Sequence, residues 1–261
     1  MSIDGRGGGV RIGILAVQGD VSENAAAISN ALKTPRGFDS DSVVLVKAPG
    51  EVPGLDGLVL PGGESTTIGR LSLANGMMDA VRSRIRDGMP VLGICAGLIM
   101  LAKSASDRVV GSVPGQPLLG VLDVDIQRNA FGRQRQSFEA RLNMKTLAIS
   151  DFKGVFIRAP VIRGAAPDVD VLCELAGAGA RADGEKAASD PRSGAAGDGG
   201  DGSNGNGATP AAATTDHNAG HRTIVAVRKG NVMGTAFHPE LSGDLAVHKH
   251  FVDVVRRQKR G

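Results

Sequence analysis

Cys95 stands between two glycines, where a strand pattern passes into a helix pattern. The segment Gly93-Ile94-Cys95-Ala96-Gly97 closes an apolar stretch that begins at residue 91. The glycines permit a tight turn that lifts the thiol above a sheet, an arrangement known as a nucleophile elbow. The N-terminus of the following helix favours the thiolate, and the N–H group of Ala96 points where an oxyanion would form. A buried structural cysteine fits this motif equally well.

His238 and Glu240 follow the strand pattern 232–237 and provide a base with a group to orient it. A thiol nucleophile needs a base, and that base needs a neighbour to hold its ring. Residues two apart at a strand end project the same way, so Glu240 can bond one ring nitrogen while the other faces Cys95. A histidine in an ordinary turn is the alternative. The chain's other histidines do not lie at metal-ligand spacing from a cysteine, so we expect no metal site.

A glycine-rich segment, Pro61–Thr67, directly follows the apolar stretch 58–60. Gly62 and Gly63 allow close backbone approach to a ligand and can supply a second oxyanion donor. Taken alone, the segment is also consistent with a plain turn. It is not a phosphate-binding P-loop, because the G-x-x-x-x-G-K pattern is missing.

The elements that must position these residues alternate between strand and helix in the first hundred residues. We predict strands at 11–18, 42–46, 58–60 and 91–94, and helices at 22–33, 73–87 and 96–104. This alternation predicts an α/β fold with a parallel sheet covered on both faces by helices. The sites of such folds lie at the carboxyl ends of the strands, which is where Cys95 and the glycine-rich segment stand.

The second half of the chain changes to shorter strands that read as antiparallel or mixed. They are expected at 122–127, 137–142, 154–157, 169–175, 224–227 and 232–237, before a last helix at 244–258. Residues 176–220 consist almost entirely of small and polar types, so they cannot offset their ordering entropy by burial. We therefore predict one domain over residues 10–258 with a disordered insertion at 176–220.

Composition excludes several function classes. Aromatic residues make up 3% of the 261 residues, with no Trp and no Tyr. This argues against a module that stacks sugars on aromatic rings and against a nucleic-acid-binding protein that stacks bases on them. A net charge of +3 does not indicate a nucleic-acid partner. Two cysteines fit a reducing compartment, and the longest apolar run, 91–102, is too short to span a membrane. We expect a cytoplasmic protein without a membrane or nucleic-acid partner.

Taken together, the three motifs resemble those of the class I, triad-type glutamine amidotransferases. Within that family the resemblance is to the glutaminase subunits of pyridoxal 5′-phosphate synthases, and it covers about residues 10–258 outside the insertion. The segments that carry it are 15–19, 61–67, 93–98, 128–133, 137–140, 154–160 and 237–241. One departure is Glu23-Asn24, where the family usually has Glu-His.

The resemblance implies a fold, a reaction and a partner. The fold is a three-layer sandwich with a mainly parallel central sheet and an antiparallel extension. The reaction is hydrolysis of L-glutamine through a glutamyl thioester. The ammonia passes to a synthase subunit that makes pyridoxal 5′-phosphate from a pentose phosphate and a triose phosphate. No cofactor is expected on this chain.

The resemblance also assigns roles to individual residues. It makes Cys95 the nucleophile, His238 the general acid and base, and Glu240 its orienting group. The oxyanion and activation residues are Ala96, Gly62, Gly63 and Gln18. The residues that bind L-glutamine are Gly63, Glu64, Ser65, Arg128, Ile157 and Arg158. Gln18 ends the first predicted strand and either takes part in activation by the synthase subunit or merely bonds a strand-end backbone group.

Three other functions remain open at the level of sequence. The first is a glutaminase subunit of a different biosynthetic pathway. The second is a catalytically silent scaffold on the same fold, which the filled triad positions disfavour. The third is a cysteine-dependent hydrolase of the same sheet type, which has no need of the segments 64–67 and 156–160.

Overall fold

The computed structural model describes residues 8–33, 40–107, 111–112, 115–128, 137–176 and 222–261. Apart from residue 176, the predicted insertion 176–220 lies outside the described residues. None of the helices within these ranges is long and apolar enough to cross a membrane.

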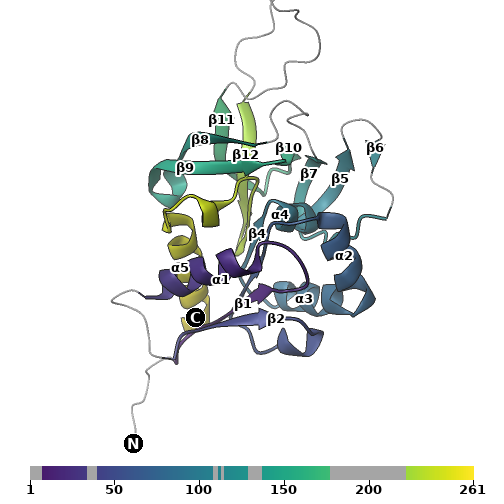
Figure 1. Ribbon diagram of the computed structural model, residues 1–261, viewed down its shortest axis with the longest axis vertical. Coiled ribbons are helices and arrows are strands. Elements are labelled where there is room, and N and C mark those ends of the chain that lie inside the picture. The colour runs from purple at the N-terminus through teal and green to yellow at the C-terminus, as the bar shows by residue number, and fades with distance from the viewer. Residues whose placement is uncertain (1–7, 34–39, 108–110, 113–114, 129–136, 177–221) are drawn as a thin grey trace, which may run out of the picture.

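Five parallel strands form the centre of the fold (Figure 1). Their order is β2–β1–β3–β4–β13. The bounds are β1 Arg11–Leu15, β2 Ser42–Val46, β3 Gly57–Leu60, β4 Val91–Ile94 and β13 Val232–Thr235. Every residue of β3, β4 and β13 is buried, which is the expected burial for parallel strands covered on both faces.

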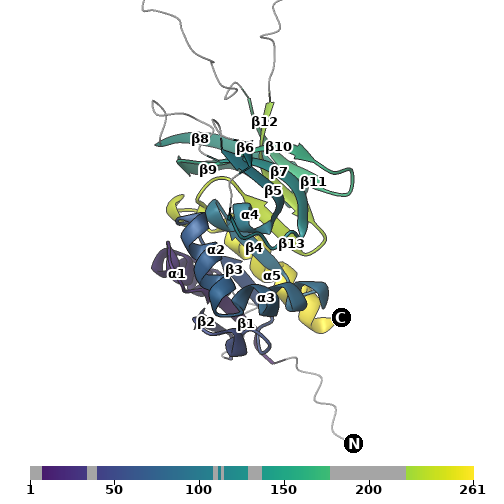
Figure 2. The same cartoon turned by 90° about the vertical axis from the view of Figure 1, so that its right-hand side faces the viewer.

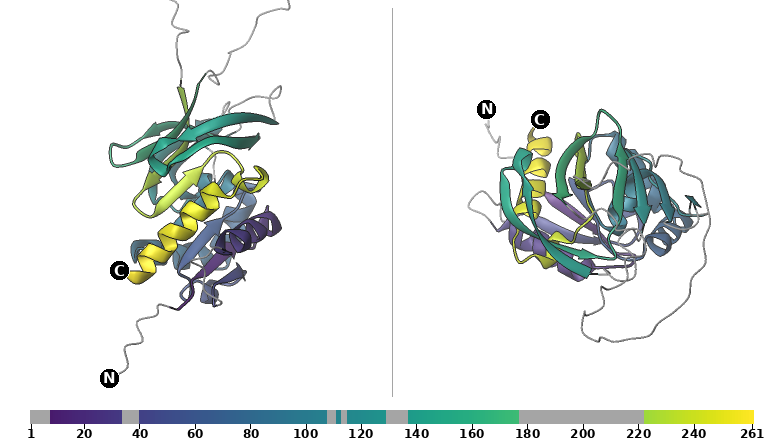
Figure 3. Two further views of the ribbon diagram at one scale, coloured as in Figure 1. Left: turned by 90° about the vertical axis from the view of Figure 1, so that its left-hand side faces the viewer. Right: turned by 90° about the horizontal axis from the view of Figure 1, so that it is seen from above.

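Helices cover both faces of this parallel sheet. Figure 2 shows one face beneath α2, α3 and α4, whereas the left view of Figure 3 shows the other face beneath α1 and α5. The bounds are α1 Val21–Leu32, α2 Ser65–Ala74, α3 Met77–Arg86, α4 Ala96–Leu101 and α5 Ala246–Arg260. Helix α5 turns Val247, Phe251 and Val255 into the core, as its apolar spacing predicts.

An antiparallel extension continues the sheet beyond β13. β12 pairs with β13, followed by β10, β7, β5 and β6, and β11 also pairs with β12. These pairings are antiparallel except that of β5 with β7, which is parallel. The bounds are β5 Ala102–Asp107, β6 Gly111–Ser112, β7 Leu122–Arg128, β10 Val161–Ala165, β11 Asp170–Ala176 and β12 Arg222–Lys229. The α/β architecture with a parallel centre and an antiparallel extension is therefore confirmed.

A separate hairpin lies against the carboxyl end of the parallel sheet. It consists of β8, Ser137–Met144, and β9, Ile149–Ile157, joined through the 3₁₀ turn η3, Lys145–Leu147. Two of its phenylalanines, Phe152 and Phe156, have ring centroids 5.7 and 5.8 Å from that of Phe237. The backbone N–H of His238 also donates to the carbonyl of Val155 at 2.8 Å. These contacts hold β9 beside the segment that carries His238.

Several observed elements differ from the predicted ones. The helix predicted at 73–87 corresponds to α3 and the end of α2, which are separated at Gly76 by a φ of +79°, and residues 65–72 of α2 were not predicted as helix. The helix predicted at 96–104 stops at Leu101, because residues 102–107 pair with β7 as strand β5. Strand β10 was not predicted. The short turns η1, Pro49–Glu51, and η4, Pro239–Leu241, complete the described elements.

Helix α4 lies directly against strand β3, and Gly97 makes this approach possible. A Cβ atom at residue 97 would overlap the backbone carbonyl of Leu60. A Cβ atom at Gly93 would lie 2.8 Å from the backbone of Gly97. The two glycines that flank Cys95 are therefore required by packing between backbone segments.

We predict that Gly97→Ala destabilises the fold by roughly 1–3 kcal/mol, because the backbone of Leu60 cannot move aside as a side chain would. Gly50→Ala is the matched control, since nothing lies within 4 Å of the Cβ atom it would gain. Chemical denaturation measures both free energies of unfolding. Equal stability of the two variants would show that the close approach at Gly97 is unimportant.

Candidate active site

Cys95 occupies a strained turn between β4 and α4. Its φ and ψ are 48° and −97°, a positive φ that costs a non-glycine residue about 1–3 kcal/mol. The backbone N–H of Cys95 donates to the carbonyl of Thr235 on β13 at 2.8 Å, which helps to hold the turn. This is the geometry expected of a nucleophile elbow, whereas the second cysteine, Cys173, is buried within strand β11.

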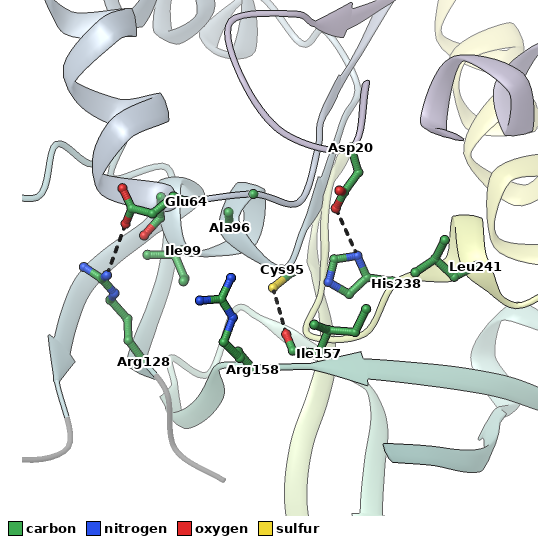
Figure 4. A pocket seen from close by; sticks show the side chains of 12 residues that line it. Asp20, Glu64, Cys95, Ala96, Ile99, Arg128, Ile157, Arg158, His238 and Leu241 are labelled. Carbon is green, nitrogen blue, oxygen red and sulfur yellow. Dashed lines mark hydrogen bonds and ion pairs between the residues drawn. The ribbon is translucent and has the colours of Figure 1, made fainter. Parts of the chain in front are cut away.

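His238 and Glu240 come together with Cys95 at the carboxyl end of the sheet. The imidazole of His238 faces the side chain of Cys95 (Figure 4), and its Nδ1 lies 2.8 Å from Oε1 of Glu240. The side chain of Glu240 is fully buried, and its Oε2 atom has no hydrogen-bond partner among the described residues. The structure therefore brings together the three residues that the sequence proposed as a triad, of which Figure 4 shows Cys95 and His238.

The surroundings of His238 favour its charged form. Burial opposes the charge, but hydrogen bonds from the imidazole to Cys95 and Glu240, and the charges of these two groups, raise the pKa of His238 to about 10. The imidazole is consequently protonated at neutral pH. A protonated imidazole beside a cysteine sulfur can deliver a proton to a leaving group.

A further carboxylate, Asp20, faces His238 and was missed by the sequence analysis. Its Oδ2 lies 3.5 Å from Nδ1 of His238 (Figure 4). Asp20, His238 and Glu240 offer potential metal-ligand atoms within 4.8 Å of one another. We assign this cluster to orienting the imidazole, because Nδ1 already bonds Glu240. Position alone could have indicated Asp20, since it follows Gln18 at the same edge of the sheet.

The loop that carries Asp20 is fastened to the glycine-rich segment. The N–H of Asp20 donates to the carbonyl of Gly62 at 3.0 Å, and the N–H of Glu64 donates to Oε1 of Gln18 at 3.0 Å. Gly63 has a φ of +148°, and a Cβ atom there would lie 2.6 Å from Oε1 of Gln18. The prediction that Gln18 ends the first strand is wrong, because β1 ends at Leu15 and Gln18 belongs to the loop before α1.

A cavity of about 320 Å³ opens beside the thiol of Cys95. Its volume, and its lining of charged, polar and apolar side chains, suit a small polar molecule. All six predicted glutamine-binding residues contribute to it, whereas Gln18, Gly62 and Glu240 lie outside its lining. The lining consists of Asp20, Gly63, Glu64, Ser65, Cys95, Ala96, Ile99, Arg128, Ile157, Arg158, His238 and Leu241.

Opposite charges face each other at the end of the cavity away from His238 (Figure 4). Glu64 caps α2 by accepting hydrogen bonds from the backbone N–H groups of Thr66 and Thr67. Partial burial opposes its ionisation, but the hydrogen bonds from Thr67 and Thr66 outweigh burial and lower the pKa of Glu64 to about 2. Nη2 of Arg128 lies 3.5 Å from Oε1 of Glu64. The pair presents a fixed anion and a fixed cation to the cavity.

Ile157, the last residue of β9, and Arg158, which follows it, both line the cavity. The carbonyl oxygen of Ile157 lies 3.9 Å from Sγ of Cys95. Arg158 has a positive φ of 44°, and its guanidinium group extends between Arg128 and Cys95 in Figure 4. Strained backbone of this kind persists only where the surrounding structure enforces it, and it gathers at functional sites.

We predict that Glu240→Gln lowers the pKa of His238 by roughly 1–3 pH units, because the imidazolium loses its buried counterion. In the wild type, the raised pKa contributes stability that is complete below pH 6.5 and lost as the pH rises towards about 10. NMR titration of the His238 ring measures the change. Asp244→Asn, on the same segment, should leave the titration unchanged. An unaltered ring titration in Glu240→Gln would refute the assignment of the counterion.

Comparison with known proteins agrees with this geometry. A model of the SNO glutamine amidotransferase family matches residues 14–186. A "Pyridoxal 5′-phosphate synthase subunit PdxT" from Nitrosopumilus maritimus (strain SCM1) is 43% identical over 96% of this chain and 98% of the relative. A protein of the same name from Methanosarcina mazei is 41% identical over 94% of this chain and 98% of the relative.

The similarity extends to a solved structure. A crystal structure described as a glutamine amidotransferase has a TM-score of 0.67 and 34% identity, and the match covers 94% of this chain and 98% of that one. The resemblance found in the sequence motifs is thereby confirmed. The chain belongs to the SNO glutamine amidotransferase family.

Proposed function

We propose that this protein is a glutaminase that hydrolyses the side-chain amide of L-glutamine to L-glutamate and ammonia. The observation that carries the proposal is the contact of Cys95, on its strained turn, with an imidazole held by the buried carboxylate of Glu240. The cavity beside this contact offers charges that complement a free amino acid. Membership of a glutamine amidotransferase family supports the same substrate.

Glutamine would bind with its amino-acid end at the charged end of the cavity. Its α-ammonium group is complementary to Glu64, and its α-carboxylate to Arg128 and Arg158. The side-chain amide then reaches the sulfur of Cys95 beside His238. Ser65 and Ile157 also line the cavity.

In the first half-reaction the thiolate of Cys95 attacks the amide carbon. The oxyanion that develops is stabilised by backbone N–H groups, for which Ala96 and the Gly62–Gly63 segment are the candidates. The protonated imidazole of His238 gives its proton to the departing nitrogen. Ammonia leaves, and a glutamyl thioester and a neutral imidazole remain.

The second half-reaction uses the same histidine as a base. The charge of Cys95 and its hydrogen bond help to raise the pKa of His238, and thioester formation removes both contributions. The neutral imidazole accepts a proton from an attacking water, and the thioester breaks to glutamate and thiolate. The original protonated imidazole is thereby restored.

The name shared by the relatives supports a role in pyridoxal 5′-phosphate synthesis, where the ammonia passes to a synthase subunit. This partner and a cytoplasmic location stay predictions for the present chain. Ammonia release from glutamine, with and without a candidate synthase subunit, tests both the activity and the pathway. Absence of ammonia release in both conditions would refute the proposed function.

Mass spectrometry of the chain after reaction with a glutamine-like alkylating analogue tests the nucleophile. We predict a single adduct at Cys95 and complete loss of hydrolysis in Cys95→Ser, without loss of the fold. Cys173 is the internal control, because burial raises the pKa of its thiol and keeps it unreactive. Labelling of Cys173 in place of Cys95 would overturn the assignment.

We also predict that the isolated chain is weakly active and that the synthase subunit stimulates it. In this structure the carbonyl of Gly62 is held by the N–H of Asp20, while Gln18 holds the N–H of Glu64. Rotation of the peptide between Gly62 and Gly63 would turn an N–H group towards the oxyanion, and glycine tolerates either sign of φ. One such donor is worth roughly a hundred- to a thousandfold in rate.

Gln18→Ala should reduce this stimulation more than it changes the KM for glutamine. The measurement is steady-state hydrolysis by wild type and variant, each with and without the partner. Full activity of the isolated wild-type chain would refute activation by docking. Equal stimulation of both proteins would show that Gln18 only satisfies the N–H of Glu64.

A further inference from the structure

Gln116 lies outside every motif of the sequence, yet its side chain joins two parts of the candidate site. It belongs to the segment between β6 and β7. Its Oε1 accepts hydrogen bonds from the hydroxyls of Ser65 and Thr66 and from Nη1 of Arg128, each at 3.1 Å. Its Nε2 donates to the carbonyls of Ser65 and Pro117, also at 3.1 Å. Both polar atoms of the amide therefore make hydrogen bonds, and these bonds connect the first turn of α2 to Arg128 at the end of β7.

The surface of α2 is shaped to receive this segment. At Gly69, a Cβ atom would lie 3.0 Å from Cδ of Pro117 and 3.3 Å from Nε2 of Gln116. The helix therefore lacks a side chain at the place where the segment crosses it. The contact of Gln116 with α2 is part of the packing and does not arise from a chance approach of exposed side chains.

The contact determines where the guanidinium group of Arg128 lies. Nη1 bonds both Gln116 and Thr66, and Nη2 faces Glu64, while the side chain of Arg128 remains only 14% exposed. An amide oxygen accepts from Arg128 without neutralising it, in contrast to a carboxylate. Gln116 thus helps to hold the cation in place without adding a negative charge beside it.

We propose that Gln116 is a positioning residue that sets Arg128 and Ser65 for the α-carboxylate end of the substrate. This inference rests on the proposed glutaminase function and deepens it. Gln116 acts through the recognition of the carboxylate and not on the reacting amide, because its contacts lie on Arg128 and α2 and not on Cys95 or His238. Its loss should therefore weaken binding and spare the chemical step.

Gln116→Glu is the sharpest test, since it keeps the shape and adds one negative charge beside Arg128. We expect the KM for glutamine to rise on the order of ten- to a hundredfold, the worth of a hydrogen bond to a charged group. The kcat of the full chain with its synthase partner should stay within about twofold, since a group that acts only in binding changes KM and not kcat. Gln116→Met, which removes the polar atoms without adding charge, should raise KM less and in the same direction.

Gln127→Glu is the matched control. Gln127 precedes Arg128 on β7, and its Oε1 also accepts from an arginine, Arg163, but neither residue lines the cavity. The same substitution there should leave KM and kcat unchanged. Circular dichroism and thermal melting of each variant establish that it is folded before the kinetics are compared.

A second readout does not depend on turnover. Alkylation of Cys95 by iodoacetamide is measured against increasing glutamine, or against 4-aminobutanamide, which has the amide and the amine but no α-carboxylate. In Gln116→Glu, the half-protecting concentration of glutamine should rise ten- to a hundredfold, as KM does, and that of 4-aminobutanamide should hardly change.

Two outcomes would overturn the role of Gln116. Equal weakening for both compounds would mean that the substitution distorts the whole cavity. Unchanged protection and KM in both Gln116 variants would mean that Arg128 needs no such support. Failure of the proposed function looks different, since the wild type would then neither release ammonia nor be protected by glutamine.

Discussion

The strained backbone at Cys95 is the constraint on which the rest of the site depends. A positive φ at a non-glycine residue survives only when its surroundings compensate for the strain. Here the compensation comes from the buried sheet: the Cys95 N–H bonds β13, and Gly97 lets α4 lie directly on β3. The fully buried strands β3, β4 and β13 thus provide the rigid frame that holds the thiol at the N-terminus of a short helix. Without that frame the same five residues would relax to an ordinary turn.

The hairpin of β8 and β9, in the second half of the chain, positions His238 and Ile157 at the site. Phe237 packs against Phe152 and Phe156 of the hairpin, and the backbone of the next residue bonds Val155. These contacts fix His238 and Ile157 beside the sulfur (Figure 4), so a hairpin far from Cys95 in sequence forms part of the cavity wall. The apolar contacts of a few phenylalanines therefore decide the geometry of the polar site, even in a chain that is poor in aromatic residues.

Charge is divided between the two ends of the cavity. Near Cys95, two carboxylates face one imidazole, whose pKa is raised to about 10. At the far end, the anion of Glu64 is held by the first turn of α2 and the cation of Arg128 by Gln116 and Thr66. The two ends share the segment 62–66, which touches His238 at Gly62 and Arg128 at Thr66. A movement of this one segment would therefore alter binding and chemistry together.

The sequence by itself determined the features that depend on neighbouring residues. The apolar stretch before Cys95 and the glycines around it predicted a nucleophile elbow after a buried strand. The spacing of His238 and Glu240 predicted that the two side chains would pair. Both patterns involve residues close together in the chain, so they can be recognised without the tertiary structure. Only the tertiary structure decided strands β5 and β10 and the contacts of Asp20 and Gln116. Gln116 lies 51 residues from Ser65 along the chain, and no local pattern encodes that hydrogen bond. It exists because burial of the sheet and its helices brings distant segments to one edge, where their polar groups must find partners.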